Sequence, residues 1–499
     1  MTKDPNTDNN NHNNNNNLGL RPNGYTITED SEAIHTPVSG MVTPETTKRG
    51  GVDLTEGHLL KGIALLSWPI VTGAVLNWIM GGADTKMVSS LGPEAIAAVG
   101  QSQGIIFTIM AIIFAIGTGT QVLVARYTGA KRPDRVAEVT RQTIIISIIV
   151  GILMVPLGLV LARPSLALLG VDGQVLHFGT AYMQAFFWGS IGLIINFMLP
   201  AALQGAGDTL TPLYTLMWMN VLHIASGYVM IFGVGPVPAM GVAGAAWAVV
   251  LSRGVAAIYM IWVVTSGRYA ITVPLKHSWR IHWPIWGKMF YIGMPSSLQG
   301  LTRNVAYLML AAILNHTVAG TFAISGHTVA GQWGALGIFI GLAMMTAAMT
   351  AVGQNMGANN DHRAEKSCWH VVYISAISST ILGGLCIVFG HPLVRFFTDD
   401  PQAMYWGWWA LLFLSASLPF ATVSMAFSGG LRGAGDTMSP LWATLICTLV
   451  IGPSLAWLLA LKLGMGPIGA WIGLAVSMVA QAMVTGVIFQ MGKWKRIEI

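Results

Sequence analysis

Long apolar runs separated by short polar stretches fill most of this chain of 499 residues. Most runs reach the roughly 20 residues that an α-helix needs to cross a bilayer. Strands of a membrane barrel would be about half as long and would alternate polar with apolar residues, which these runs do not. We therefore predict an all-α polytopic membrane protein. Its twelve transmembrane helices are expected at residues 59–82, 101–125, 140–162, 175–199, 212–233, 241–264, 287–314, 322–350, 369–390, 404–428, 440–462 and 467–490.

The composition excludes a soluble fold for the bulk of the chain. Hydrophobic residues make up 54% of the sequence and charged residues only 9%, against roughly 25% charged residues in an ordinary soluble domain. The mean hydropathy is +0.61. The net charge of +6 does not indicate nucleic-acid binding, because the basic residues lie mainly in short loops between the apolar runs.

The positions of these basic residues predict the orientation in the membrane. Loops after odd-numbered helices carry only Lys86, Arg163, Arg395 and Lys462. Because cytoplasmic loops are enriched in Lys and Arg, the even-numbered loops and both termini should be cytoplasmic. The even-numbered loops carry Arg126, Lys131, Arg132, Arg135, Arg141, Arg268, Lys276, Arg280, Lys288, Arg363, Lys366 and Arg432.

An internal repeat relates the two halves of the chain. LQGAGDTLTPL at 203–213 returns as LRGAGDTMSPL at 431–441, an offset of 228 residues. Gly129 and Gly357 share this offset. Each repeat covers six predicted helices, an even number that preserves orientation. The two six-helix repeats should therefore be related by an axis along the membrane normal.

Two tails and a linker complete the predicted organisation. Residues 1–57 are rich in Asn and lack apolar periodicity, so we expect a disordered, Asn-rich cytoplasmic tail. This tail is not a signal peptide, because no apolar core follows its first charged residues. The N-terminal repeat should occupy 58–264 and the C-terminal repeat 287–490, with a cytoplasmic linker at 265–286 and a basic cytoplasmic tail at 491–499.

This organisation predicts a transporter rather than an enzyme. Two parallel halves with a cavity between them suit alternating access to a substrate bound near the middle of the membrane. The phosphate-binding GxxxxGK[ST] pattern is missing, so nothing indicates ATP hydrolysis. Cys368, Cys386 and Cys447 lie far apart and show neither metal-ligand spacing nor a disulfide framework. We expect no metal, and no cofactor beyond a coupling ion.

Several motifs resemble the multidrug and toxic compound extrusion (MATE) family. GAGDT followed by Pro occurs once in each half. ADTKMVSSLGPEAIAAVG at 83–100, GVAGAAWA at 241–248 and VGQNMGANNDHRAE at 352–365 are similar to that family as well. The resemblance covers roughly 59–490. It implies an efflux antiporter in the inner or plasma membrane that exports small amphiphilic compounds or drugs and is driven by a cation gradient.

Asp84 is the acid most plausibly inside the membrane. A carboxylate in a low-dielectric environment can gain and lose a proton near neutrality, and it could equally hold Na⁺. The resembling family ties an Asp at the matching place in its first helix to cation coupling. The alternative is an acid at the outer membrane interface, because about 20 residues counted from Gly62 end the span near Gly81.

His223 is the second candidate for ion coupling. The family commonly carries an Asn and an Asp one turn apart on its fifth helix, and those positions fall on His223 and Gly227 here. The Asp is therefore missing, although Asn220 lies one turn before. His223 can take a proton at physiological pH, or it can be a hydrogen-bonded packing residue.

Two arginines lie deep in predicted helices, Arg253 and Arg303. Arg303 corresponds to Asn77 at the offset of 226 that also relates Pro69 to Pro295. We expect Arg303 to line the central cavity, where it attracts an anionic or zwitterionic group or tunes Asp84. We expect Arg253 to cap carbonyls between helices, which is also the alternative for Arg303. The predicted substrate cavity comprises Asn77, Asn220, Gln299, Arg303, Asn304 and Gln332.

The two GAGDT segments are expected to be turns. Their glycines should end one helix, and Thr211 or Ser439 should cap the next. Pro212 and Pro440 would then take the first helical position, where no N–H is needed.

These observations predict an ion-coupled antiporter that works as a monomer in the lipid bilayer. Protons are favoured over Na⁺, because a single acid supplies too few oxygen ligands for a metal shell. Two alternatives stay open. One is a flippase for lipids or lipid-linked oligosaccharides from the same superfamily. The other is a non-transporting membrane scaffold that binds partners through its Asn-rich tail.

Overall fold

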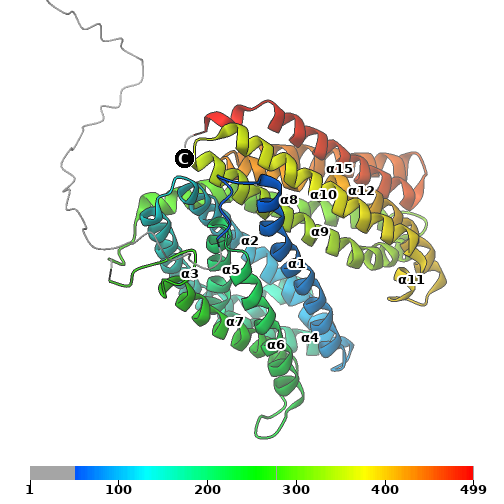
Figure 1. The fold of residues 1–499 in the computed structure, drawn as a ribbon. Coiled ribbons are helices and arrows are strands. Elements are labelled where there is room, and N and C mark those ends of the chain that lie inside the picture. Colours follow the sequence, from blue (N-terminus) through cyan, green and yellow to red (C-terminus); the bar gives the residue numbers. More distant parts are fainter. Residues whose placement is uncertain (1–50, 277, 498–499) are drawn as a thin grey trace, which may run out of the picture. The chain divides into compact units, whose positions relative to one another are not determined.

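The computed structural model describes residues 51–276 and 278–497, and over these residues it contains helices and no named strand (Figure 1). The first half begins with α1 (Leu59–Ser89), α2 (Pro93–Gly129) and α3 (Pro133–Leu168). It continues with α4 (Gly173–Trp188), α5 (Ser190–Gly205), α6 (Leu210–Phe232) and α7 (Gly241–Thr265). Helices α4 and α5 form one span that is bent by 59° at the break between them.

The second half repeats this series of helices. It contains α8 (Trp283–Asn315), α9 (Gly320–Gly357), α10 (Asp361–Val388), the short α11 (Gly390–Arg395), α12 (Pro401–Gly433) and α15 (Gly466–Gln490). The eleventh span is built from α13 (Met438–Thr444), η1 (Leu445–Ile451), α14 (Gly452–Trp457) and η2 (Leu458–Lys462), where η1 and η2 are π-helical. The final turn, η3 (Lys493–Arg496), is a 3-10 helix.

The prediction of an all-α membrane protein with twelve transmembrane helices is confirmed. Length and hydropathy alone qualify up to eleven spans within the described residues, and the 33-residue α8 completes the set. The predicted helices were too short. Helix α9, for example, covers 38 residues, because a helix continues past the apolar stretch that crosses the bilayer.

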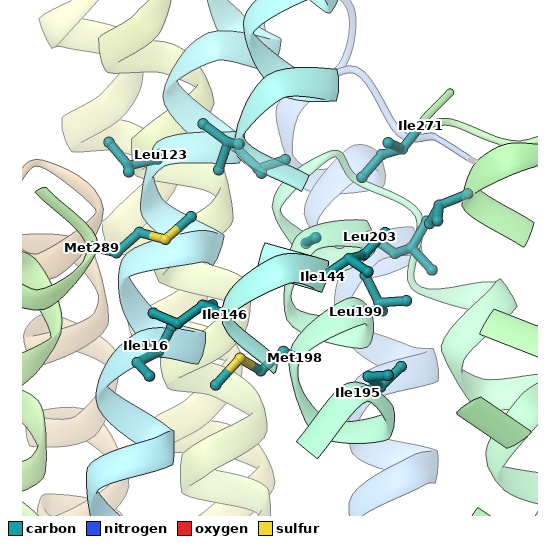
Figure 2. Close-up of a cluster of buried hydrophobic side chains, with 14 of the residues drawn as sticks. Ile116, Leu123, Ile144, Ile146, Ile195, Met198, Leu199, Leu203, Ile271 and Met289 are labelled. Carbon is teal, nitrogen blue, oxygen red and sulfur yellow. The ribbon is translucent and has the colours of Figure 1, made fainter. Parts of the chain in front are cut away.

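A large apolar cluster holds the first half together and joins it to Met289 of α8 and Met349 of α9 (Figure 2). Ile116 and Leu123 of α2 meet Ile146 of α3 and Met198 of α5 in this cluster. Ile271 of the linker is also buried there. The linker is held further by the Gln142 side chain of α3, which accepts from the backbone N–H of His282 and the indole of Trp286 and donates to the carbonyl of Arg280. The linker therefore packs on the first half.

The two halves meet through glycines that pack on each other's backbone. A Cβ on Gly129 of α2 would lie 1.8 Å from the carbonyl oxygen of Gln354 in α9, and a Cβ on Gly357 would lie 2.0 Å from that of Arg126. Gly119 and Gly293 form a second pair of this kind between α2 and α8. Both contacts are reciprocal, and the Gly129–Gly357 contact joins equivalent positions of the repeat, as expected when a two-fold relation links two repeats.

Residues 51–57 correct the prediction of a disordered tail over 1–57. The Arg363 guanidinium donates to the carbonyls of Leu54, Glu56 and Gly57, and Gln354 accepts from the backbone N–H of Leu54. Leu54 itself is buried. The Val52 backbone N–H also donates to the carbonyl of Gly207 in the first half. The segment is ordered because it hydrogen-bonds to both halves where these meet. The rest of the predicted tail, residues 1–50, lies outside the described residues.

The GAGDT segments are turns, but their capping differs from the prediction. Helix α6 begins at Leu210, so Thr211 is already helical and Pro212 is not its first residue. The cap is Asp208, whose carboxylate accepts from the Thr211 backbone N–H at 3.0 Å and from its hydroxyl at 2.7 Å. Asp436 likewise accepts from the backbone N–H of Ser439. Burial raises the pKa of the Asp208 carboxyl, and the hydrogen bonds from Thr211 oppose that shift.

The glycine contact between the halves generates a stability prediction. Gly129→Ala should lower the Tm of the detergent-purified protein, because the new methyl group collides with backbone and overpacking typically costs about 1–3 kcal/mol. Gly104→Ala on the same helix is the matched control, since a Cβ there meets nothing within 4 Å. Its Tm should stay equal or rise, because Ala favours helix by up to about 1 kcal/mol. Equal Tm values for both variants would contradict tight packing at Gly129.

Candidate functional site

Asp84 of α1 and His223 of α6 form a hydrogen-bonded pair in the first half. The Asp84 Oδ1 and His223 Nε2 atoms are 2.7 Å apart, and the two side chains are 35% and 8% exposed. On the other side of the ring, Ser252 Oγ of α7 lies 3.4 Å from Nδ1 and donates its own hydrogen to the carbonyl of Ala248. Both ring nitrogens therefore lie within hydrogen-bond distance of an oxygen atom.

The pair lines a small cavity of about 110 Å³. Tyr182 of α4 and Gln103 of α2 face the same space and hydrogen-bond to each other. Arg253 of α7 lies within electrostatic reach of Asp84 and Tyr182. The remaining wall is mostly apolar and comes from α1, α2, α6 and α7. The cavity has room for several water molecules but is smaller than the roughly 300 Å³ or more of a drug-binding pocket.

The structure places several of the predicted residues of the first half. Asp84 is a residue of α1, which continues to Ser89. Gly227, the position where the family's Asp is missing, lines the same cavity as His223. Asn220 is partly buried on α6 and is not among the residues that line the cavity. Arg253 lies within electrostatic reach of Asp84. Its backbone carbonyl accepts a hydrogen bond from the Asn196 side-chain amide.

A second polar cluster lies in the other half. The Arg432 guanidinium of α12 donates to Oε1 of Gln299 in α8 and lies 3.1 Å from the Met345 sulfur of α9. Arg303 of α8 is close enough to repel Arg432 electrostatically. The sequence had assigned Arg432 to a cytoplasmic loop, and this was wrong. Helix α12 extends to Gly433 and leaves Arg432 only 3% exposed.

The remaining predicted cavity residues are exposed at helix surfaces. Asn77 of α1, Asn304 of α8 and Gln332 of α9 are all exposed. Gln332 takes part in a contact between the halves, because its carbonyl accepts from the indole of Trp78 at 3.0 Å. The predicted residues thus divide into an acid–histidine pair, an arginine cluster and surface amides rather than one group.

Sequence reasoning missed Tyr182, Gln103 and the role of Arg432 in these clusters. The repeat contained a signal for Arg432, since it replaces Gln204 in the otherwise similar GAGDT motif. Nothing comparable marked Tyr182. Within 51–276 and 278–497, no group of three or more His, Cys, Asp or Glu residues comes together to hold a metal ion.

Comparisons with known proteins agree with this architecture. The MatE family model matches residues 69–229 and 295–458. The chain is 27% identical over 449 residues to "Probable multidrug resistance protein NorM" of Thermotoga maritima, covering 88% of this chain and 94% of that protein. It is also 27% identical over 442 residues to a protein of the same name from Rhizobium meliloti, covering 84% and 90%.

A solved structure shows the same fold. It is described as the "Outward-facing conformation of a multidrug resistance MATE family transporter of the MOP superfamily". It superposes with a TM-score of 0.83 at 25% identity and covers 90% of this chain and 98% of its own. The resemblance first suggested by the GAGDT motifs is therefore confirmed, and this chain belongs to the MATE family of multidrug efflux transporters.

Proposed function

We propose that this protein is a proton-coupled antiporter that exports small amphiphilic organic compounds or drugs. The observation that carries the proposal is the Asp84–His223 pair, held at 2.7 Å on the wall of a small cavity with room for water. A partly exposed carboxylate beside a buried imidazole can hold a different number of protons in different conformations. Such a difference is what couples a proton gradient to a conformational cycle.

The proton would be exchanged on this pair. In the unloaded state a proton shared between Asp84 Oδ1 and His223 Nε2 leaves the pair neutral overall. Addition of one further proton to the carboxylate breaks the ion pair and frees α6 from α1 at this point.

The surroundings of Asp84 favour H⁺ over Na⁺. A sodium ion needs several oxygen ligands, as hard cations do. Asp84 is instead faced by the imidazole of His223, and the positive charge of Arg253 lies nearby. Both groups oppose a metal cation, whereas a proton requires only the carboxylate or the imidazole.

Alternating access would use the contact between the halves. The reciprocal glycine contacts and the 51–57 segment hold the halves together at the end of the bundle where α2 and α9 finish. The charge asymmetry of the loops supports assigning this end to the cytoplasm, with the protein as a monomer in the plasma membrane. Protonation on the opposite side would then accompany substrate release, and re-closure of that side would open the cytoplasmic contact.

Asp84→Asn should abolish proton-driven transport. The amide keeps the shape and one hydrogen bond to His223, but it neither gains nor loses a proton in this pH range. The measurement is efflux of a fluorescent cation such as ethidium from proteoliposomes under separate pH and Na⁺ gradients. We expect transport by the variant to fall to the level of empty liposomes, with normal folding and reconstitution.

Glu94→Gln is the matched control, because this acid is exposed at the start of α2. It should transport like the wild type. Coupled transport at the wild-type rate by Asp84→Asn would refute the assigned role of this carboxylate. Wild-type transport driven by the Na⁺ gradient alone would refute proton coupling.

The proposed orientation can be tested separately. Reporter fusions after residue 495 and within 130–136 should both report a cytoplasmic location, because the basic loops fix the orientation. An extracytoplasmic signal from either fusion would contradict it. A fusion in the loop at 234–240, between α6 and α7, is the opposite control and should report the outer side.

A further inference from the structure

Two arginines in the second half have no acidic partner. Arg432 is 3% exposed and Arg303 is partly exposed. Among the residues that the structure describes, neither guanidinium has a carboxylate within ion-pair distance, and the charge of Arg303 repels that of Arg432. Buried charges are stable only when paired, and two neighbouring cations are worse than one. This cluster therefore has a net positive charge that the protein leaves uncompensated.

Hydrogen-bond donors in the cluster are also unused. One amino group of Arg432 donates to the side-chain oxygen of Gln299, and the other donates to the Met345 sulfur, a weak acceptor. Its Nε is buried without a partner, and so is Nε2 of Gln299, a side chain of a residue only 1% exposed. Unpaired buried donors of this kind are rare in folded proteins. An acceptor bearing negative charge would satisfy them together.

The donors lie along one face of α8. Ser296, Gln299 and Arg303 are spaced by three and four residues, which places them on the same side of a helix. The Ser296 hydroxyl is likewise without a partner. Helix α8 packs against α2 of the other half through Gly293. These three donors thus follow Gly293 and the contact between the halves along α8. Arg303 is the outermost of them and is partly exposed.

The internal repeat shows that the fold does not require these charges. Arg303 and Arg432 correspond to Asn77 and Gln204 in the first half. In return, Asp84 and His223 correspond to Leu310 and Ile451 in the second. The same scaffold therefore carries its acid in one half and its deep arginine pair in the other.

We propose that Arg303, Arg432 and Gln299 form an anion-binding site that takes the carboxylate or phosphate group of an exported compound. Guanidinium groups match the two oxygens of such a group in a planar, bidentate geometry. Arg303, the outermost donor, receives the anion, and Arg432 with the Gln299 amide holds it. The site rests on the proposed export function and adds amphiphiles with an anionic group to its substrates.

The test is equilibrium binding to detergent-purified protein, which requires no ion gradient. The probes are fluorescein, which carries a carboxylate, and rhodamine 123, a cationic xanthene of similar size. Arg432→Gln and Arg303→Gln should each weaken fluorescein binding by about tenfold or more, as expected for a lost charge-assisted hydrogen bond. Rhodamine 123 binding should be unchanged or tighter, because a repelling charge has been removed.

Arg395→Gln is the matched control, since this arginine of the same half is exposed at the end of α11. It removes the same charge and should leave both affinities unchanged. Arg432→Lys keeps the charge but loses the bidentate geometry, so its fluorescein affinity should fall between the wild type and Arg432→Gln. Unchanged fluorescein binding in both Gln variants would overturn the site. Equal loss of both dyes, together with a lower Tm, would show that the arginines only hold helices together.

A lipid headgroup carries the same phosphate chemistry, and a second arm distinguishes it. Fluorescein binding is repeated in nanodiscs of neutral phosphatidylcholine and in nanodiscs containing phosphatidylglycerol. Equal affinity in both would support a soluble substrate. The opposite result would be loss of wild-type fluorescein binding in the anionic nanodiscs, together with a lipid-dependent Tm that Arg432→Gln does not show. That result would assign the site to lipid and overturn the substrate proposal. If binding behaves as proposed while proteoliposome transport by the wild type fails, the anion site stands and the antiport proposal does not.

Discussion

The close approach of α2 to α8 and α9 is the contact on which the rest of the molecule depends. Gly129 and Gly357 each leave room for a carbonyl of the opposite half, and Gly119 and Gly293 do the same one layer further along. In lipid, helices associate through such close van der Waals packing because no hydrophobic force acts between apolar surfaces. A contact made of small residues on backbone can also separate without leaving charged groups unpaired.

The contact joins two halves of opposite chemical character. The first half holds an acid–histidine pair beside a cavity of about 110 Å³, and the second holds two deep arginines. Ionisable groups inside a membrane protein are expensive and are retained where they act. In the proposed function, this separation of charge between equivalent positions of one scaffold would let ion and substrate groups bind in different halves. Movement of the halves relative to each other would then link the two events.

The pattern of apolar runs, the loop charges and the repeat determined most of the fold. Helices that cross lipid satisfy their backbone hydrogen bonds internally, so their existence follows from local sequence. The sequence also singled out Asp84, His223, Gln299 and Arg303 as polar residues within apolar segments. Helix ends were less predictable, because polar residues extend helices such as α1 and α9 beyond their apolar runs.

Only the tertiary structure decided which of these residues meet. The Asp84–His223 pair joins positions 139 residues apart, and the Arg432–Gln299 hydrogen bond joins positions 133 apart. Such pairings depend on how helices pack, and helix packing leaves no mark in the spacing of residues along one helix. The order of residues 51–57 was hidden for the same reason, since a polar segment is held there by Arg363 and Gln354, some 300 residues away. Local sequence therefore determined the helices, whereas long-range contacts determined the sites.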